Sequence, residues 1–414
     1  MLALDLVQTL AFGGLVLFAG YGIRKVIPPL ARYNIPAPVV GGLLVALVIT
    51  VARRRGVTLV SFDTTLQPPL MIAFFTSIGF GASVSLLRVG GPLVLIFFLV
   101  STGAAVAQNV LGAICAHLIG QPPLLGVLAG SVTLTGGPAT GLAFAGEFQE
   151  AGVPAARTVA VAAAMVGIVC GGILGGPIGT WLIERRSLAS KRGPAPSTAP
   201  PTAQAVVEGH MSEPVQAVPA GEDRESYALL KTLVVMLVAM WLGGLVSVWL
   251  NARLASYNMA LPAYIGAMIV AAAIRNLDDA LGIVGISQSL VDDLGNVALS
   301  LFLVLALMTL QLWEIVNLAL PLAIILVFQV ALVAALSLWV IFRLMGRDYD
   351  AAVTSSGFCG FMLGTTANAM ANMEALVQRS GSAPRAFLVV PMVGAFFIDF
   401  TNSLIITAFL NLLR

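Results

Sequence analysis

The stretch Gly130 to Gly141 reads GSVTLTGGPATG and decides how the rest of the chain is interpreted. It lies inside a long apolar run, yet it holds four glycines, a proline and four hydroxyl side chains. Glycine and proline are the poorest helix formers, so a helix is expected to break here. Broken backbone at membrane depth survives only where it is buried in protein or lines a wet cavity. The stretch therefore raises the question of what the break is for.

Composition places this break in a membrane protein. The chain has 414 residues, of which 59% are hydrophobic and 10% charged, and its mean hydropathy is +0.99. A soluble protein of this length carries more charge on its surface. The net charge of +2 gives no case for a nucleic-acid partner. We expect an all-α polytopic protein whose helices cross the lipid bilayer.

Apolar runs long enough to span a bilayer give the order of the helices. Two further apolar segments, 124–148 and 350–377, are interrupted. The segment 185–226 is rich in Pro, Ala and Ser, cannot build a core, and is predicted to be a flexible linker. The expected spans lie at about 6–27, 36–52, 66–87, 92–119, 155–183, 227–250, 260–275, 291–312, 318–342 and 384–413.

The two sides of the linker resemble one another. Gln108 has a counterpart in Gln329, GGPAT at 136–140 aligns with LGTTA at 363–367, and Met165-Val-Gly matches Met392-Val-Gly. The offsets between these matches stay between 221 (329 − 108) and 227 (392 − 165). We therefore predict two structural repeats, 1–184 and 227–414.

The orientation of the repeats depends on whether the interrupted segments cross the membrane. If both re-enter and return, each repeat has five crossings, and an odd number makes the repeats inverted. This arrangement places most Lys and Arg on the linker side, which the positive-inside rule makes cytoplasmic, although Arg53, Arg54 and Arg55 lie on the other side. Both termini are then external.

Two broken segments at matching places in inverted repeats predict a substrate site near the middle of the membrane. Half-helix N-termini offer N–H donors to an anion, and oxygens of the broken backbone and nearby side chains suit sodium. Close helix packing alone is the alternative use of these small residues. The predicted substrate-binding residues are Ser131, Thr133, Thr135, Gly136, Gly137, Thr365, Thr366, Asn368 and Gln108.

Asp399 lies deep in an apolar span, in the sequence GAFFIDFTNSLII. An intramembrane carboxylate is costly and by default marks an ion path. The functional interpretation is a sodium ligand or a proton site, and the alternative is a structural hydrogen bond. The predicted Na⁺-binding residues are Asp399, Asn402, Thr401 and Asn372. No organic cofactor is expected, and no HExxH, GxSxG or phosphate-loop motif indicates an enzyme.

Several long stretches resemble the bacterial sodium/glutamate symporter family. They include PLMIAFFTSIGFGAS (69–83), GVLAGSVTLTGGPATG (126–141) and AFLVVPMVGAFFID (386–399), and the resemblance covers nearly all of the chain except the linker. It implies sodium-coupled glutamate uptake by alternating access, two inverted five-helix repeats with re-entrant hairpins, a homodimer and the cytoplasmic (inner) membrane. One departure is Ala139, which stands where the family has a glycine in its first hairpin tip.

Other functions compete with this interpretation. Symport of aspartate or a dicarboxylate would use the same scaffold. An uncoupled anion facilitator would have no use for the buried Asp399. A sodium/proton exchanger would need a buried carboxylate pair or a buried lysine partner, and the sequence offers one Asp alone.

Overall fold

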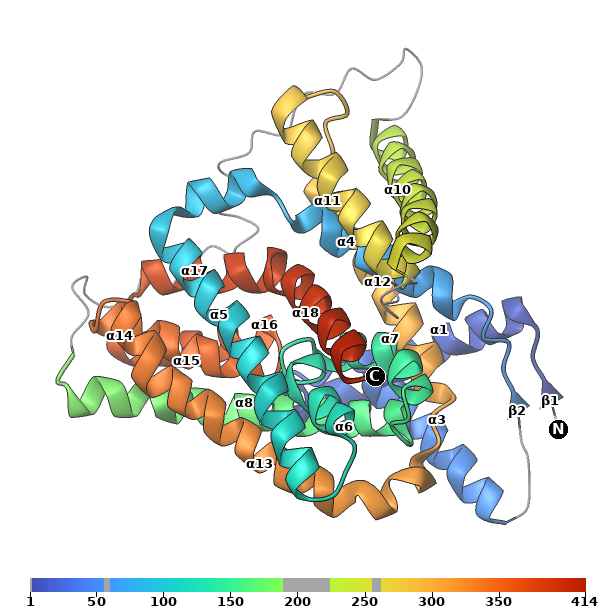
Figure 1. Ribbon diagram of the computed structural model, residues 1–414, viewed down its shortest axis with the longest axis horizontal. Helices are drawn as coiled ribbons and strands as arrows, with labels where there is room; N and C mark the ends of the chain where they lie inside the picture. Colours follow the sequence, from blue (N-terminus) through green and yellow to red (C-terminus); the bar gives the residue numbers. More distant parts are fainter. Residues whose placement is uncertain (1, 56–59, 189–223, 255–261) are drawn as a thin grey trace. The chain divides into compact units, whose positions relative to one another are not determined.

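The computed structural model describes residues 2–55, 60–188, 224–254 and 262–414 (Figure 1). Most of the predicted linker 185–226 lies outside these residues. The described chain is helical apart from two short strands, β1 (Leu2–Ala3) and β2 (Val60–Ser61), which pair in parallel. The prediction of an all-helical chain with several apolar spans is thus confirmed.

The chain divides into two compact units. Unit 1 comprises Met1–Gly20, Gly41–Val89 and Val207–Thr309, and unit 2 comprises Tyr21–Val40, Gly90–Val206 and Leu310–Arg414. Each unit takes segments from both halves of the sequence. The units reflect contacts in space, whereas the predicted repeats rest on likeness along the sequence, so the two divisions of the chain differ.

Unit 1 is built around a helix cluster in which α11 packs against α4 and α10, and α4 also packs against α12. Its apolar core includes Phe80, Met236 and Ala271. α10 and α11 cross closely, because a Cβ atom on Gly266 would lie 2.4 Å from the Gly243 carbonyl oxygen. The helices are α4 (Gln67–Gly81), α10 (Arg224–Leu254), α11 (Ala263–Leu281) and α12 (Gln288–Met308), with parts of α1 (Leu6–Val26) and α3 (Ala37–Arg54).

Unit 2 holds both interrupted segments. In the first, α7 packs on α8, and in the second, α15 packs on both α8 and α16 (Figure 1). α8 therefore supports both broken segments. The elements are α2 (Pro28–Arg32), most of α5 (Val84–Leu118), α6 (Pro123–Val127), η1 (Leu128–Val132), α7 (Gly137–Glu150), α8 (Ala156–Arg185), η3 (Leu312–Leu318), α13 (Ala319–Ala335), η4 (Leu336–Ile341), α14 (Phe342–Leu344), α15 (Tyr349–Leu363), α16 (Thr366–Ser380), α17 (Pro384–Phe396) and α18 (Ile398–Leu413).

Six helices of the described chain are long and apolar enough to cross a membrane, or seven if the bent pair α17–α18 forms one span. Ten were expected. α3 has an apolar part of only Ala37–Arg53, and α4 has 15 residues. At about 1.5 Å per residue, α4 is shorter than a hydrocarbon core of about 30 Å. α11 carries Arg275, Asp278 and Asp279 in its last turns.

Boundaries also differ between α4 and α5. The predicted spans 66–87 and 92–119 meet at a loop after residue 87, but α4 ends at Gly81 and α5 begins at Val84. α5 is then interrupted at Gly91, whose φ is +70°, directly before Pro92. Glycine tolerates this left-handed conformation and proline removes a backbone donor, so the helix breaks there.

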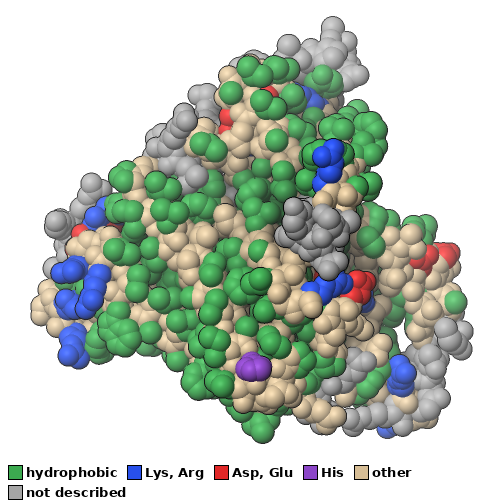
Figure 2. Space-filling model, viewed as in Figure 1, with side chains coloured by type: hydrophobic (Ala, Val, Ile, Leu, Met, Phe, Trp, Pro, Cys, Tyr) green, Lys and Arg blue, Asp and Glu red, His purple; other side chains and the backbone are tan. Residues whose placement is uncertain are grey.

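The surface agrees with a bilayer environment. Hydrophobic side chains spread widely over the face in Figure 2, while Lys, Arg, Asp and Glu occupy few places. The predicted span on α10 exposes Trp241, Val248 and Trp249 by more than half. Apolar side chains exposed over a whole helix are favourable in lipid and costly in water. The chain is a membrane protein with several apolar spans.

Candidate functional site

The first interrupted segment, here called hairpin 1 after the prediction, consists of α6, η1 and α7. Its first arm ends in the π-helical turn η1, where Gly130 leaves helical geometry (φ −101°, ψ −130°). The chain then turns through Thr133 to Gly136 and starts α7 at Gly137, which has φ +66°. Only glycine adopts that conformation without strain, so the two glycines and Pro138 form the turn. Ala139 is inside α7 with no positive φ, so the departure from the family pattern leaves the turn intact.

The second interrupted segment, hairpin 2, consists of α15, the residues Gly364 and Thr365, and α16. Gly364 has φ −148° and ψ −98°, and it separates the two helices. The Thr365 hydroxyl caps α16 by accepting a hydrogen bond from the Asn368 N–H at 3.3 Å. The hairpin thus has the break that the sequence predicted, at the position predicted.

The tips of the two hairpins meet inside unit 2. A Cβ atom on Gly137 would lie 3.7 Å from the Gly364 carbonyl oxygen. Gln108 of α5 links the tips, since its Oε1 accepts from Thr135 Oγ1 (2.7 Å) and its Nε2 donates to the Met362 carbonyl (3.1 Å). Gln329, its sequence counterpart, donates to the Gln108 carbonyl at 2.7 Å. Both glutamines are fully buried.

Both tips present the N-terminus of a helix. The N-cap residue of α7 is Gly136, which has no side chain to satisfy the first N–H groups of the helix. Thr365 satisfies one N–H of α16. Unsatisfied N–H groups and the helix dipole make such termini favourable positions for anions. Thr365 and Thr366 are half-buried, whereas Thr135 is buried.

Ser131 of η1 is held by two asparagines from other helices. Its N–H donates to Asn109 Oδ1 at 3.0 Å, and its carbonyl accepts from Asn402 Nδ2 at 3.0 Å. All three side chains are fully buried. Asn109 Nδ2, Ser131 Oγ and Asn402 Oδ1 nevertheless have no hydrogen-bond partner within the described chain. Its place beside Gln108 in an apolar span makes Asn109 a candidate for lining the cavity or for joining helices, but it was not among the predicted substrate- or sodium-binding residues.

Asp399 lies one turn before Asn402 on α18 and is half-buried. Residues at i and i+3 share a helix face, so its carboxylate lies on the side of Asn402. No hydrogen bond or ion pair joins this carboxylate to another residue of the described ranges. Thr401 donates to the carbonyls of Phe397 and Ile398, which is an intrahelical bond. The structure thus brings Asp399 and Asn402 together.

Other predicted residues hold the hairpins in place. Asn368 Nδ2 donates to the Ile168 carbonyl (2.8 Å), and Asn368 Oδ1 accepts from Asn34 Nδ2 (3.0 Å). Asn372 Nδ2 donates to the Gly171 carbonyl at 2.9 Å. Within hairpin 1, Thr133 Oγ1 donates to the Leu128 carbonyl at 2.8 Å.

Asn34 is a further residue that the sequence analysis missed. It lies between α2 and α3 with φ +54°, a conformation in which asparagine is enriched. Its place before Ile35-Pro36 was the only signal in the sequence. It brings this loop against hairpin 2 within unit 2.

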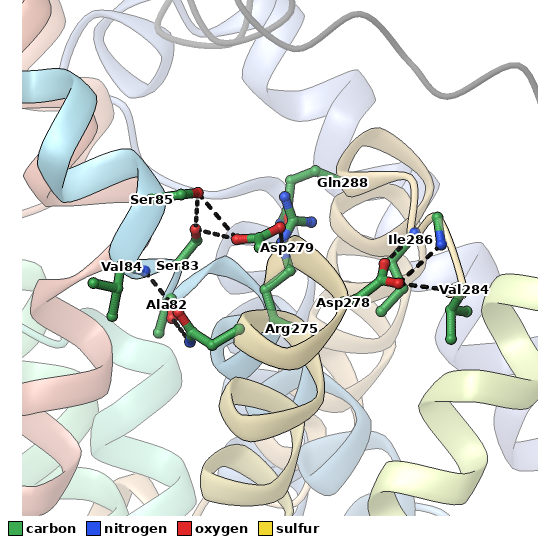
Figure 3. Close-up of polar contacts among 12 residues, drawn as sticks. Ala82, Ser83, Val84, Ser85, Arg275, Asp278, Asp279, Val284, Ile286 and Gln288 are labelled. Carbon is green, nitrogen blue, oxygen red and sulfur yellow. Dashed lines mark hydrogen bonds and ion pairs between the residues drawn. The ribbon is translucent and has the colours of Figure 1, made fainter. Parts of the chain in front are cut away.

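A separate polar cluster belongs to unit 1 (Figure 3). The almost fully buried Arg275 forms an ion pair with Asp279 (2.9 Å) and donates to Gln288 Oε1 (2.9 Å). Asp279 also accepts hydrogen bonds from Ser83 and Ser85 at the start of α5. All charges of this cluster are paired, so it stabilises the α4–α5 junction and offers no open site.

Asp278 ends the same helix and binds the backbone of the next loop. Its carboxylate accepts from the N–H groups of Val284, Gly285 and Ile286 at 2.6, 3.1 and 2.9 Å. Partial burial raises the pKa of Asp278, but these three donors and the charge of Arg275 outweigh burial and hold the pKa below its ordinary value.

Comparisons with known proteins match most or all of the chain. The family model described as Sodium/glutamate symporter matches residues 2–382. The sodium/glutamate symporter of Escherichia coli (strain K12) is 40% identical over 413 residues, which cover 100% of this chain and 99% of that protein. The sodium/glutamate symporter of Haemophilus influenzae is 37% identical over 404 residues, which cover 96% of this chain and 95% of that protein.

Proposed function

The chain belongs to the sodium/glutamate symporter family, and we propose that it couples sodium entry to glutamate uptake by alternating access. The observation that carries this proposal is the meeting of two hairpin tips, each with a helix N-terminus, in the unit that also holds Asp399, whose carboxylate has no bonded partner in the described chain. A transporter needs such a site for an anion and a cation together, and the reaction changes no covalent bond.

The hairpin tips are the proposed substrate site. Glutamate carries two carboxylates, and the N-termini of α7 and α16 can each receive one. Gly136 and Gly137 let the backbone approach the substrate, and the half-buried Thr365 and Thr366 supply hydroxyls. Gln108 and Thr135 bond to each other, so their role is to hold the two tips in register. Thr133 forms a hydrogen bond within hairpin 1, and Asn368 bonds hairpin 2 to α8, so both residues stabilise the hairpins.

Asp399 is the proposed centre of the sodium path. Its carboxylate supplies the negative charge that a buried cation needs, and Asn402 supplies an oxygen one turn away. Thr401 and Asn372 belong to the same proposed set, although Thr401 bonds to its own helix and Asn372 to α8. Asp399 is therefore the residue whose loss should affect sodium coupling most.

The proposed topology is two inverted repeats of five spans, each with a re-entrant hairpin. The order of elements supports it, because α5, hairpin 1 and α8 correspond to α13, hairpin 2 and α17–α18. Both termini are external, the linker is cytoplasmic, and the protein is a homodimer of the inner membrane in this proposal. Cysteines placed at Thr135 and Thr366 should both react with small thiol reagents from water, and failure of both in every state would contradict re-entry.

The driving force suffices for concentrative uptake. A tenfold sodium gradient supplies about 1.4 kcal/mol per ion. Each net charge that moves through 100 mV adds about 2.3 kcal/mol. Transport of monoanionic glutamate with one sodium ion is electroneutral and gains only from the sodium gradient. Transport with two sodium ions moves one net charge and gains from both the gradient and the membrane potential.

Reconstituted liposomes test the proposal. Labelled glutamate should accumulate when sodium is higher outside and should not accumulate when potassium replaces sodium. Competition by aspartate and dicarboxylates in the same assay distinguishes glutamate from the other small anions. Equal uptake in sodium and potassium would contradict coupling and indicate a facilitator.

A further inference from the structure

Three buried atoms without hydrogen-bond partners, Asn109 Nδ2, Ser131 Oγ and Asn402 Oδ1, lie on Ser131 and its two asparagine neighbours. In unit 2 the buried hydroxyls of Thr354, Ser355 and Thr407 donate to a carbonyl of their own helix, whereas those of Ser101 and Thr102 on α5 have no partner in the described chain. The Ser131 hydroxyl has none either, and Asn109 and Asn402 each leave one amide atom without a partner in the described chain. Buried polar atoms without partners are costly, so three on one residue and its two neighbours indicate a missing occupant.

We propose that these three atoms face a common pocket that holds a sodium ion together with one water molecule. Ser131 Oγ and Asn402 Oδ1 coordinate the ion, and Asn109 Nδ2 donates a hydrogen bond to the water. This inference rests on the proposed function and deepens it, because it adds Asn109 and assigns Ser131 to the ion instead of the substrate.

The orientation of both amides is fixed by the backbone of Ser131. An N–H group can donate only to an oxygen, so Asn109 must turn Oδ1 toward the Ser131 N–H. A carbonyl can only accept, so Asn402 must turn Nδ2 toward the Ser131 carbonyl. A flipped amide cannot remove the unsatisfied atoms. The pocket therefore presents two oxygens and one N–H donor.

This set of atoms suits a hydrated cation. Sodium takes oxygen ligands, and an N–H group is repelled by a cation but binds the oxygen of a water that the cation holds. Asp399, one turn before Asn402, supplies the negative charge that stabilises an ion in a buried place. A water molecule alone would satisfy the three atoms but would have no use for this charge.

The pocket also lies next to the residue that joins the hairpin tips. Asn109 and Gln108 are consecutive on α5, and Gln108 bonds to Thr135 and Met362. An ion that fixes Ser131 therefore also orders the three residues between Ser131 and Thr135. By linkage, sodium should raise the affinity for glutamate and glutamate should raise the affinity for sodium.

Radioactive sodium binding to the purified full-length protein, in detergent and without glutamate, tests the pocket. The variant Ser131→Ala removes a hydroxyl that no described residue uses, and Ser355→Ala removes an equally buried hydroxyl that bonds within its own helix. Loss of a ligand should raise the sodium dissociation constant about tenfold in Ser131→Ala, whereas that of Ser355→Ala should change less than about twofold. Asn109→Ala should weaken sodium binding by about tenfold as well.

Ser131→Cys serves as a second variant, since it keeps the side-chain volume and replaces a hard oxygen with sulfur, a poor ligand for sodium. Melting temperatures in potassium report whether each variant is folded. Unchanged sodium affinity in both folded Ser131 variants would overturn the pocket and assign it to water alone. Sodium-driven uptake by the wild-type protein would in that case still support symport. Wild-type protein that binds no sodium would instead overturn the proposed function and the pocket together.

Discussion

Hairpins 1 and 2 occupy matching places in the two halves of the sequence, but the buried polar side chains around them differ in how completely they are hydrogen-bonded. In hairpin 2, both amide ends of Asn368 are bonded, and Asn372 bonds to α8. In hairpin 1, Ser131 and its neighbours Asn109 and Asn402 leave three buried atoms without partners in the described chain. The protein itself satisfies these amides of hairpin 2, whereas in our proposal the atoms without partners around hairpin 1 are satisfied by a sodium ion and its water.

The largest expected effect is at the charge beside hairpin 1. Asp399→Asn keeps the shape of the side chain and removes its charge, so sodium-driven uptake should fall about a hundredfold or more, as expected for an essential cation ligand. Uptake into liposomes measures this loss, with a melting temperature in potassium as the control for folding. Wild-type sodium dependence in this variant would remove Asp399 from the ion path.

The tip of hairpin 1 should be nearly as sensitive. Gly137→Ala places a Cβ atom on a residue with φ +66°, at a cost of about 1–2 kcal/mol. Glutamate uptake should fall at least about tenfold if the turn is displaced, since 1.4 kcal/mol corresponds to a factor of ten. Ala139→Gly is the matched control, because Ala139 is helical and its replacement should leave the turn unchanged. Equal effects of the two changes would argue against a specific turn.

A substitution in hairpin 2 should lower the stability of the protein and leave its sodium affinity unchanged. Asn368→Ala leaves the Ile168 carbonyl and the Asn34 amide without their partner, at a cost of about 1–3 kcal/mol. Thermal unfolding should show this loss, while sodium binding without glutamate should match the wild-type protein. A variant with normal stability and weakened sodium binding would reverse the roles assigned to the two hairpins.

Asn34→Ala sharpens the same contrast with a smaller effect. It removes, from a half-buried position, an amide that donates to Asn368 Oδ1 at 3.0 Å and to the Ala367 carbonyl at 3.5 Å, so stability should fall by about 0.5–1.5 kcal/mol. Chemical unfolding of the two single variants and of Asn34→Ala/Asn368→Ala together tests this contact. Strict additivity would show that the two amides do not interact.

Unit 1 supplies a comparison outside both hairpins. Because the folded-state pKa of Asp278 is lowered from 3.8, its stabilising contribution is complete above that ordinary value and is lost as the pH falls through the lower folded value. Asp278→Asn should therefore lower the melting temperature slightly at neutral pH, and the difference should shrink in acid. A difference that grew in acid would contradict this assignment, and sodium affinity should not change.

The sequence predicted most of the architecture because apolar length and broken periodicity are local signals. The positions of both breaks followed from Gly136, Gly137 and Gly364, and the family followed from long shared stretches. Fewer helices of the described chain than the ten predicted spans are long and apolar enough to cross a membrane, because α4 is short and Arg275 and its neighbours lie in the last turns of α11. Apolar composition alone does not measure helix length.

The sequence indicated which types of residue form the candidate site, but it did not indicate the role of each residue. Polar residues in apolar spans pointed to Gln108, Asp399 and Asn402, but composition could not tell which amides would be bonded by backbone. That depends on contacts between segments far apart in sequence, such as Asn402 with Ser131 and Asn34 with Asn368. Asn34 was missed for this reason, and Asn109 was given no role at the site.

Hydrogen exchange compares the two hairpins within one sample and tests their different roles most directly. Backbone amides of residues 128–136 and 361–368 would be followed in the purified protein with sodium or with potassium at equal ionic strength. Completion of hairpin 1 by sodium predicts slower exchange in 128–136 when sodium is present, with little change in 361–368. Protection by sodium confined to 361–368, or equal in both segments, would contradict the assignment of the ion to hairpin 1.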